Sequence, residues 1–509
     1  MGLRKRFTIN LLATWSNHVL GLLLALILMP RVLGTLGDSL YGTWVFISAI
    51  AGYAGLLSLG LGQTVSRYVA THHADGDSEQ VNRVVNVIGA VYLVMSGLAL
   101  AIAGVLAWLA PDLWPNSTVA VSELRWVILI LGLNAAVSIT GGVFGGVLIG
   151  LQRFELEKAF VLLSGVVRFV LTIALLRKDS GLMILAVIFL ATTAAENLGC
   201  VLCAFRLVPT LRLGFRFLNR QTLRECFSFS AFALLEAVSA TLIESADCVV
   251  IGCVLGAEAI VPYSVAQRLC QYISKPLQGI ASVCLPRAGE LHAQGQMAEL
   301  RDLLCRAVGL AWLLMMGFFI GASFFGPTLL ETWVHKAYPQ SQTILLLLLG
   351  GQLVATPMKV VTSVLFGMGD VRRPSLFYVM EALANFALSI SLVYGVGLIG
   401  VALGTVVPLY LVELGLLLPY ALRRLEIEPR RLLTDVAGPQ LAPLVALLGY
   451  SYLIWSQVPL VPGWNNMIAI AAGGGLVLGA TWLGQQKLIS WLSGRQWAAN
   501  KLGIAKPQT

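Results

Sequence analysis

Residues 84–109 read VVNVIGAVYLVMSGLALAIAGVLAWL, and this stretch carries no charged side chain. An α-helix rises about 1.5 Å per residue, so about 20 apolar residues cross the hydrocarbon core of a bilayer. The stretch is long enough to cross with some tilt. It therefore predicts a transmembrane helix.

Runs of the same kind recur along the chain, separated by charged residues, proline or glycine clusters. We expect about fourteen spans, at 7–33, 43–69, 84–109, 124–150, 159–176, 181–205, 227–255, 259–286, 304–333, 341–366, 375–394, 396–421, 437–456 and 465–486. The first span follows a basic start, but it is too long for the core of a signal peptide.

The composition agrees with a lipid-facing surface. Of the 509 residues, 58% are hydrophobic and only 12% are charged, whereas about a quarter of the residues in soluble domains are charged. The 51 glycines suit close helix approach in a membrane. The eight cysteines lie in or beside apolar segments, and we expect them to be small apolar fillers rather than a disulfide framework.

The distribution of Lys and Arg among the loops predicts the orientation, because cytoplasmic loops are rich in these residues. The loops on the side opposite the two termini carry only Arg31, Arg125, Arg177, Lys178 and Lys336. We therefore expect a multi-pass protein of the bacterial inner membrane with both termini in the cytoplasm. The formal net charge of +9 follows from this topology, and we do not expect nucleic acid as a partner.

The longest internal polar stretch is 206–226, where arginines alternate with leucine and phenylalanine. It predicts either an amphipathic segment on the cytoplasmic lipid surface or a plain linker. We expect an N-lobe at 1–205 (spans 1–6), this cytoplasmic linker at 206–226, and a C-lobe at 227–421 (spans 7–12). Spans 13 and 14 then occupy 437–486, and residues 487–509 form a cytoplasmic tail.

An internal repeat supports this division. Short matches occur in one order at separations of 217 to 222 positions: VLG at 32–34 and 254–256, Tyr41 and Tyr263, His73-Ala74 and His292-Ala293, Trp114 and Trp333, VLIG at 147–150 and VLFG at 364–367, and Phe160 and Phe377. Each copy holds six spans, so both copies have the same orientation in the membrane. We expect two parallel six-helix lobes around a central cavity, a layout typical of transporters.

Residues 28–77, LMPRVLGTLGDSLYGTWVFISAIAGYAGLLSLGLGQTVSRYVATHHADGD, resemble the opening of polysaccharide transporters. The shared features are Tyr41-Gly42-x-Trp44, the Leu-Gly-Leu-Gly of 59–62 and Arg67-Tyr68-Val69-Ala70. The second half carries the matching pattern Asp247, Ile251-Gly252, Leu255-Gly256, Tyr263 and Ala266. These transporters form part of the multidrug/oligosaccharidyl-lipid/polysaccharide (MOP) flippase superfamily.

The resemblance implies an all-α polytopic fold of the MATE-like (MOP) type. It implies flipping of lipid-linked oligosaccharide, often on undecaprenyl pyrophosphate, for surface polysaccharide such as the O-antigen of lipopolysaccharide. The partners implied are this glycan substrate, membrane lipids, and polysaccharide polymerase or glycosyltransferase machinery. Drug/cation antiporters of the MATE type share the fold and remain the alternative.

Ionisable groups within spans are costly, so they mark cavities or partners. Arg268 and Lys275 are seven residues apart and share one helical face with Gln271. Such a basic stripe suits a pyrophosphate and a hydroxyl-rich glycan, because arginine binds phosphate oxygens bidentately. The same groups could instead pair with acids of the seventh span. Further candidate cavity cations are Lys359, Arg67 and Arg168, although we expect Arg168 to pair with Glu196.

The candidate ion-coupling acids are Glu236, Glu244 and Asp247. Glu244 and Asp247 are three apart and hence neighbours on one face. They could bind H⁺ or Na⁺ that drives transport, or act as counter-ions to Arg268 and Lys275. We expect no other cofactor, no metal site and no catalytic residues, because no phosphate-binding loop and no metal-ligand spacing occur. A membrane-embedded glycan ligase or polymerase would need a long outward-facing loop, which is absent from the predicted topology.

Overall fold

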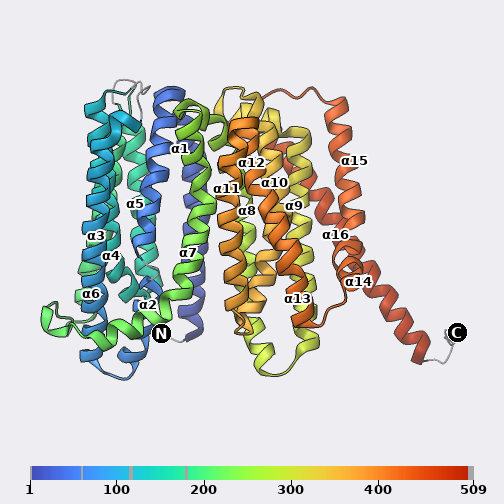
Figure 1. Cartoon of the computed structure of the whole chain (residues 1–509). Helices are drawn as coiled ribbons and strands as arrows, with labels where there is room; N and C mark the ends of the chain where they lie inside the picture. Colours follow the sequence, from blue (N-terminus) through green and yellow to red (C-terminus); the bar gives the residue numbers. More distant parts are fainter. Residues whose placement is uncertain (1–2, 59–60, 114–118, 178–180, 502–509) are drawn as a thin grey trace. The chain divides into compact units, whose positions relative to one another are not determined.

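The computed structural model describes the backbone of residues 3–58, 61–113, 119–177 and 181–501. It describes the side chains of the same ranges except 3–19, 112–113, 227–234, 236–237, 431–433 and 486–501. Every regular element in the described ranges is a helix (Figure 1). The chain divides into two compact units: unit 1 is Met1–Ser264 with Ser375–Pro408, and unit 2 is Val265–Pro374 with Leu409–Thr509.

Unit 1 begins with six helices: α1 (Leu3–Tyr53), α2 (Leu61–Ala74), α3 (Ser78–Leu113), α4 (Val121–Gly150), α5 (Phe154–Leu175) and α6 (Met183–Leu207). It also holds α7 (Arg220–Val254) and the short 3₁₀ turns η1 (Ala54–Ser58) and η2 (Phe215–Phe217). Three helices continue from one unit into the other: α8 (Ala257–Ala293), α11 (Arg372–Val396) and α12 (Leu398–Val412).

Unit 2 contains α9 (Met297–Val334), α10 (Pro339–Gly367), α13 (Leu418–Leu425), α14 (Pro429–Leu432), α15 (Leu441–Gln457) and α16 (Trp464–Lys501). Two π-helical turns, η3 (Glu413–Leu417) and η4 (Leu433–Ala437), and the 3₁₀ turn η5 (Gly438–Gln440) interrupt the helices. Single π-turns widen a helix locally and often occur at functional sites.

Among the described residues, eleven helical segments are long and apolar enough to cross a membrane. They are Leu20–Ala74, Ser78–Pro111, Val121–Gly150, Phe154–Leu175, Met183–Leu207, Met297–Val334, Pro339–Gly367, Arg372–Val396, Leu398–Leu425, Thr434–Gln457 and Trp464–Gln485. The chain is therefore a multi-pass membrane protein. Predicted spans 1 and 2 meet in the segment ending at Ala74, and spans 7 and 8 correspond to α7 and α8.

Helix α8 is not among these eleven segments. It is less apolar than they are, because it carries Gln267, Arg268, Gln271 and Lys275 within two and a half turns. The break between predicted spans 1 and 2 falls inside α1, at Gly37, whose φ of 76° lies in the left-handed region. Glycine adopts this conformation without steric cost.

The repeat is visible in the turns. Four pairs of positive-φ residues occur in the same order in both halves: Gly37 and Gly256, Gly76 and Gly295, Gln152 and Gly369, and Gly181 and Gly397. The first two pairs are each 219 positions apart (256 − 37 and 295 − 76). The two VLG matches, at 32–34 and 254–256, are separated by 222 positions. They are therefore three residues, about one helical turn, out of register with the shared backbone turn at Gly37 and Gly256.

The hydrogen bonds of two of these turns also match. Asp77 N donates to His72 O at 2.9 Å, and Gln296 N donates to Leu291 O at 2.9 Å. Arg153 N donates to Leu148 O and Asp370 N to Leu365 O, again at 2.9 Å. These bonds reach back five residues, as in the Schellman ending of a helix. The repeat therefore preserves backbone conformation where side chains have changed.

The core of unit 1 lies around α3, α4 and α6. Ser96 of α3 donates to the carbonyl of Ala136 on α4 at 2.9 Å. A Cβ at Gly132 would overlap Ala103, so glycine permits the close approach of these two helices. In unit 2, Gln342 of α10 donates to Ala322 O of α9 at 2.9 Å, and Leu313 and Ile320 of α9 pack with Leu444 and Leu447 of α15.

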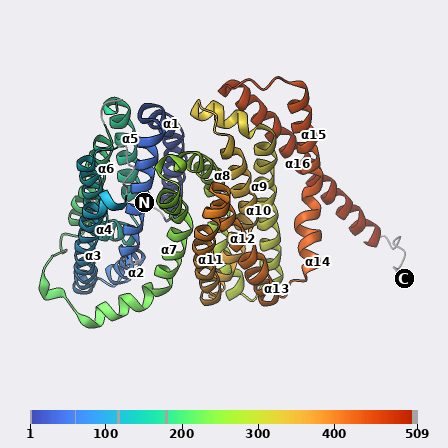
Figure 2. The ribbon, with the colours of Figure 1, turned by 45° about the horizontal axis from the view of Figure 1, so that its top comes forward.

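The connection from α6 to α7 is fixed to α3 rather than free. Asn82 Nδ2 donates to Thr210 O at 3.0 Å, and Arg212 N donates to Asn82 Oδ1 at 2.7 Å. Asn86 repeats the pattern, with Arg212 O at 2.7 Å and Gly214 N at 2.8 Å. Both views show the connection at the end of unit 1 where α2 ends and α3 begins (Figures 1 and 2). Three apolar side chains, Leu213, Phe215 and Leu218, are exposed beside its arginines.

Candidate functional site

Helix α8 carries the predicted basic stripe. Arg268 and Gln271 are half-buried and Lys275 is exposed, all on one side of the helix. The other side holds the buried residues Ala266, Cys270 and Ser274. One helix of a membrane protein thus presents a cationic, hydrogen-bonding face along two turns.

Two of the other predicted cations lie on different helices. Lys359 is half-buried on α10, two residues after Pro357. Arg67 is exposed on α2, near the end of a predicted span. A long cationic side chain at such a place can extend to lipid head groups.

Arg168 joins α5 to α6, but not through Glu196. Its Nε donates to Thr192 Oγ1 at 3.0 Å, and its guanidinium lies 4.3 Å from the centroid of the Phe189 ring. Glu196 instead accepts from Ser164 Oγ at 2.5 Å. The predicted Arg168–Glu196 pair is therefore not a direct contact, although its two helices are right and Glu196 still acts electrostatically on the guanidinium. Threonine hydroxyls and an aromatic face satisfy the arginine at this position.

The three predicted acids have different surroundings. The Glu236 side chain lies outside the described residues. Glu244 is exposed, whereas Asp247 is 1% exposed. Glu244 and Asp247 therefore do not form one buried two-carboxylate site.

Asp247 is the centre of a buried hydrogen-bonded cluster within unit 1. The hydroxyl of Tyr263 on α8 donates to Asp247 Oδ2. Thr405 Oγ1, on α12, lies 3.0 Å from the same oxygen and 3.2 Å from Oδ1. Buried carboxylates need such donors, because an unpaired charge is costly away from water. The resemblance pattern contains Asp247 and Tyr263, and the structure brings them into contact, whereas nothing in the sequence pointed to Thr405.

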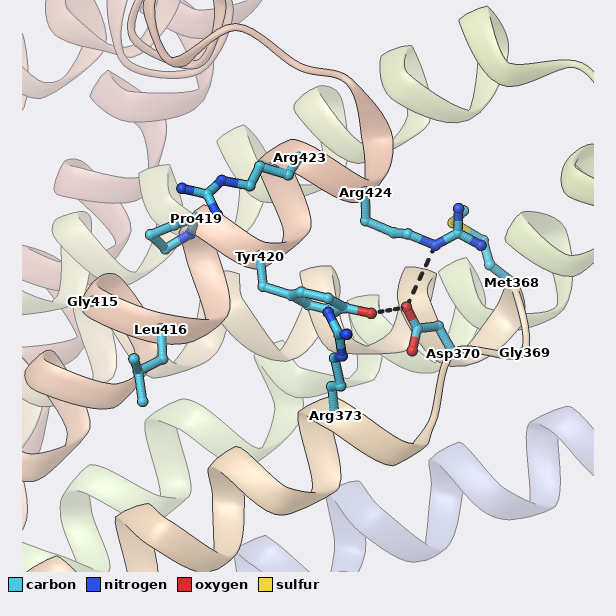
Figure 3. A pocket seen from close by; sticks show the side chains of 10 residues that line it. All are labelled: Met368, Gly369, Asp370, Arg373, Gly415, Leu416, Pro419, Tyr420, Arg423 and Arg424. Atoms are coloured by element: carbon cyan, nitrogen blue, oxygen red, sulfur yellow. Dashed lines mark hydrogen bonds and ion pairs between the residues drawn. The ribbon is translucent and has the colours of Figure 1, made fainter.

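A second polar cluster, in unit 2, was not predicted as a site. A cavity of about 870 Å³ is lined by the α10–α11 connection with the start of α11, and by η3 with α13. Figure 3 shows Asp370 at its centre, with the Tyr420 hydroxyl and the Arg424 guanidinium directed at the carboxylate. In the sequence these loops carry two pairs of arginines, Arg372-Arg373 and Arg423-Arg424, and nothing indicates that the two loops meet.

Unit 1 also contains an apolar cavity of about 310 Å³, between α1, η1, α3 and α4. Its lining includes Ile47, Tyr53, Ile102 and Ile128. Over the described residues, no group of three or more His, Cys, Asp or Glu gathers as a metal site would require. The eight cysteines form no disulfide bond.

Comparisons with known proteins define the fold. The lipid II flippase MurJ, in an inward closed conformation, superposes with a TM-score of 0.69 at 13% identity, over 95% of this chain and 98% of MurJ. An inward-facing multidrug resistance MATE transporter of the MOP superfamily gives 0.62 at 16% identity, over 83% of this chain and 97% of the transporter.

A third similar structure is a MOP superfamily transporter from Pyrococcus furiosus, described as having a binding pocket of reverse polarity that suggests a different function. It gives a TM-score of 0.53 at 16% identity, over 83% of this chain and 94% of that one. No protein in the curated collection matches this chain. The family model described as "Polysaccharide biosynthesis protein" matches residues 7–292, which is more than half of the sequence. The chain therefore belongs to the polysaccharide biosynthesis protein family and has the fold of the MOP-superfamily transporters.

Proposed function

We propose that this protein is a flippase that moves lipid-linked oligosaccharide, carried on a polyprenyl pyrophosphate, across the bacterial inner membrane. Both termini lie in the cytoplasm in this proposal. The flipped glycan is used for surface polysaccharide such as O-antigen, and the polymerase and glycosyltransferases of that synthesis are its functional partners. The protein acts as a transporter and not as an enzyme.

The observation that carries the proposal is the cationic face of α8 in a chain of this family. Arg268, Gln271 and Lys275 place two cations and an amide along two turns. Charged groups inside a membrane span are tolerated where they face water or a polar partner. A pyrophosphate carries the opposite charge, and sugar hydroxyls pair with the amide. Lys359, Arg67 and Arg168 are further candidate contacts, with Arg168 already held by Thr192.

In the proposed mechanism the protein works by alternating access. The charged head group crosses in contact with the α8 face, while the polyprenyl tail stays in lipid. This separation avoids transferring a pyrophosphate into hydrocarbon, where each buried charge is expensive.

A MATE-type drug/cation antiporter driven by H⁺ or Na⁺ is the second candidate. The observation that favours it is Asp247, a buried carboxylate held by Tyr263 and Thr405. A buried carboxylate can exchange a proton or a metal cation as its surroundings change. Glu244 and Glu236 would be accessory acids on the same helix.

Translocation in proteoliposomes tests the proposal. The substrate is a polyprenyl-pyrophosphate glycan, and a membrane-impermeant lectin reports sugar in the outer leaflet. We expect protein-dependent transfer, slowed about tenfold or more by Lys275→Ala or Arg268→Ala, since a charge-assisted contact contributes about 1.5–3 kcal/mol and 1.4 kcal/mol is tenfold.

Arg287→Ala is the matched control, because Arg287 is on the same helix but forms an exposed ion pair with Glu290 at 2.7 Å. It should transfer glycan at the wild-type rate. Glycan transfer at the wild-type rate by both Lys275→Ala and Arg268→Ala would reject the cationic site. An absence of glycan transfer, together with H⁺- or Na⁺-driven efflux of amphipathic cations, would establish the antiporter instead.

A further inference from the structure

We propose that the unit 2 cavity lined by Asp370, Arg373, Tyr420, Arg423 and Arg424 binds the phosphate group of an anionic membrane lipid. This site differs from the α8 face and does not depend on the transport substrate. We refer to it as the arginine pocket.

The charge of the arginine pocket favours an anion. Three arginines line the arginine pocket, against one carboxylate. Arg424 Nε lies 3.5 Å from Asp370 Oδ2, and the Tyr420 hydroxyl donates to the same oxygen. Arg373 lies over the Tyr420 ring, 5.1 Å from its centroid, rather than against an acid. The pocket therefore keeps an excess of positive charge that an anion would neutralise.

The geometry of the hydrogen-bond donors suits a phosphate group. Asp370 is largely buried, with 17% of its side chain exposed, while Arg424 is 49% exposed. Asp370 holds the Tyr420 hydroxyl and the Arg424 Nε (Figure 3), and each guanidinium carries further N–H donors. Planar guanidinium groups match phosphate oxygens bidentately.

The position of the arginine pocket at the ends of two candidate spans suits a lipid head group. Arg372 and Arg373 begin one candidate span, and Arg423 and Arg424 end the next. Such positions lie at the level of lipid head groups, where arginines attract anionic lipids. Leu411 and Leu414, on the helix that leads to the pocket, are exposed. An acyl chain can lie along these residues while its phosphate occupies the pocket, which favours a lipid over a free anion.

The wall of the arginine pocket leaves room for a bound group. The π-helical turn η3 places Gly415 and Leu416 against the cavity. A Cβ at Gly415 would meet no atom within 4 Å. Glycine therefore leaves space at the wall that a large side chain would fill without disturbing the fold.

Native mass spectrometry of the purified protein titrated with phosphatidylglycerol tests the proposal. The charge-removing variant is Arg373→Ala/Arg423→Ala, which spares the Asp370–Arg424 pair. We expect its apparent Kd to rise about tenfold or more. The control Arg287→Ala/Arg430→Ala removes two exposed arginines of unit 2 that do not line the pocket, and it should bind as the wild type does.

Gly415→Trp keeps every charge and places an indole ring against the cavity, so it should also weaken phosphatidylglycerol binding. Inorganic pyrophosphate at millimolar concentration separates the sources of phosphate. Lipid retained in its presence supports a lipid head group, and displacement supports the same phosphate site with a soluble anion as ligand. Unchanged lipid binding in both pocket variants, or equal loss in the control, would overturn the proposal.

Discussion

At the residue scale, Asp247 shows how a buried charge is accommodated. Its carboxylate has donors on two other helices, Tyr263 of α8 and Thr405 of α12. The cluster therefore links α7, α8 and α12 within unit 1. Glu244 lies less than one turn away and is exposed, so spacing on a helix did not decide which acid is buried.

Asp247→Ala should lower the free energy of unfolding by about 1–3 kcal/mol, because it leaves the buried Tyr263 hydroxyl without its acceptor. Thermal unfolding in detergent, followed by the fluorescence of a thiol-reactive dye, measures the change. Glu244→Ala is the matched control and should shift stability by no more than about 0.5 kcal/mol. Equal effects of the two substitutions would contradict a structural role for the Asp247 cluster.

At the element scale, glycine decides how closely helices approach. Gly42 of α1 faces the first residue of α8, and a Cβ there would overlap the carbonyl oxygen of Ala257. Small residues at such contacts let helix backbones pack closely in membranes.

Gly42→Ala should therefore destabilise the protein by about 1–3 kcal/mol, the usual cost of overpacking. The thermal midpoint in detergent is the measurement. Gly34→Ala, at an exposed position of the same helix where a Cβ meets nothing within 4 Å, should leave the midpoint unchanged or slightly raised. A neutral Gly42→Ala would show that the two helices can separate at no cost.

The α6–α7 connection is a second feature at this scale. The side chains of Asn82 and Asn86 each form two hydrogen bonds with the main chain of this connection. Of the predicted amphipathic segment, 206–226, only the part between the end of α6 and the start of α7 at Arg220 is non-helical, apart from the short 3₁₀ turn η2. Its role at the lipid surface stays a prediction, consistent with the exposure of Phe215 beside Arg216.

Asn82→Ala/Asn86→Ala should release this connection and speed trypsin cleavage after Arg212 and Arg216 about tenfold or more. Four hydrogen bonds of about 1 kcal/mol each are lost, and cleavage follows the open population. Asn466→Ala, which removes a bond to Val461 O in unit 2, is the control and should leave the cleavage rate unchanged. Cleavage of the double variant at the wild-type rate would mean that other contacts hold the segment.

At the scale of the whole molecule, the two halves share turn geometry more than sequence. The paired positive-φ residues mark the same points between helices in each copy. A repeat of six spans predicts that both copies have the same orientation in the membrane.

Cysteine labelling checks this topology. In a variant without its eight native cysteines, Lys336→Cys should react with a membrane-impermeant maleimide from outside the cell. Arg372→Cys should react only after the membrane is permeabilised. Both side chains are exposed in unit 2, so the difference reports sidedness alone. The reverse pattern would place both termini outside and reject the proposed orientation.

Much of the fold was predictable because its signals are local. Hydropathy gave the membrane segments, and the turns of the repeat are determined by residues such as Gly76 and Gly295. The helical period alone placed Arg268, Gln271 and Lys275 on one face. The predicted direct contact of Arg168 with Glu196 failed, because the sequence does not show whether an arginine side chain contacts a carboxylate or a threonine hydroxyl.

The sequence by itself determined that the chain crosses the membrane many times, that it contains an internal repeat, and that α8 has a cationic face. The first and third follow from apolar length or helical period within one short segment, and the repeat follows from turn residues that recur along the chain. Only the tertiary structure decided that Thr405 meets Asp247, 158 positions away, and that Tyr420 meets Asp370, 50 positions away. Contacts between distant segments depend on which helices pack together and in what register, and the chemistry of a single segment does not contain that information.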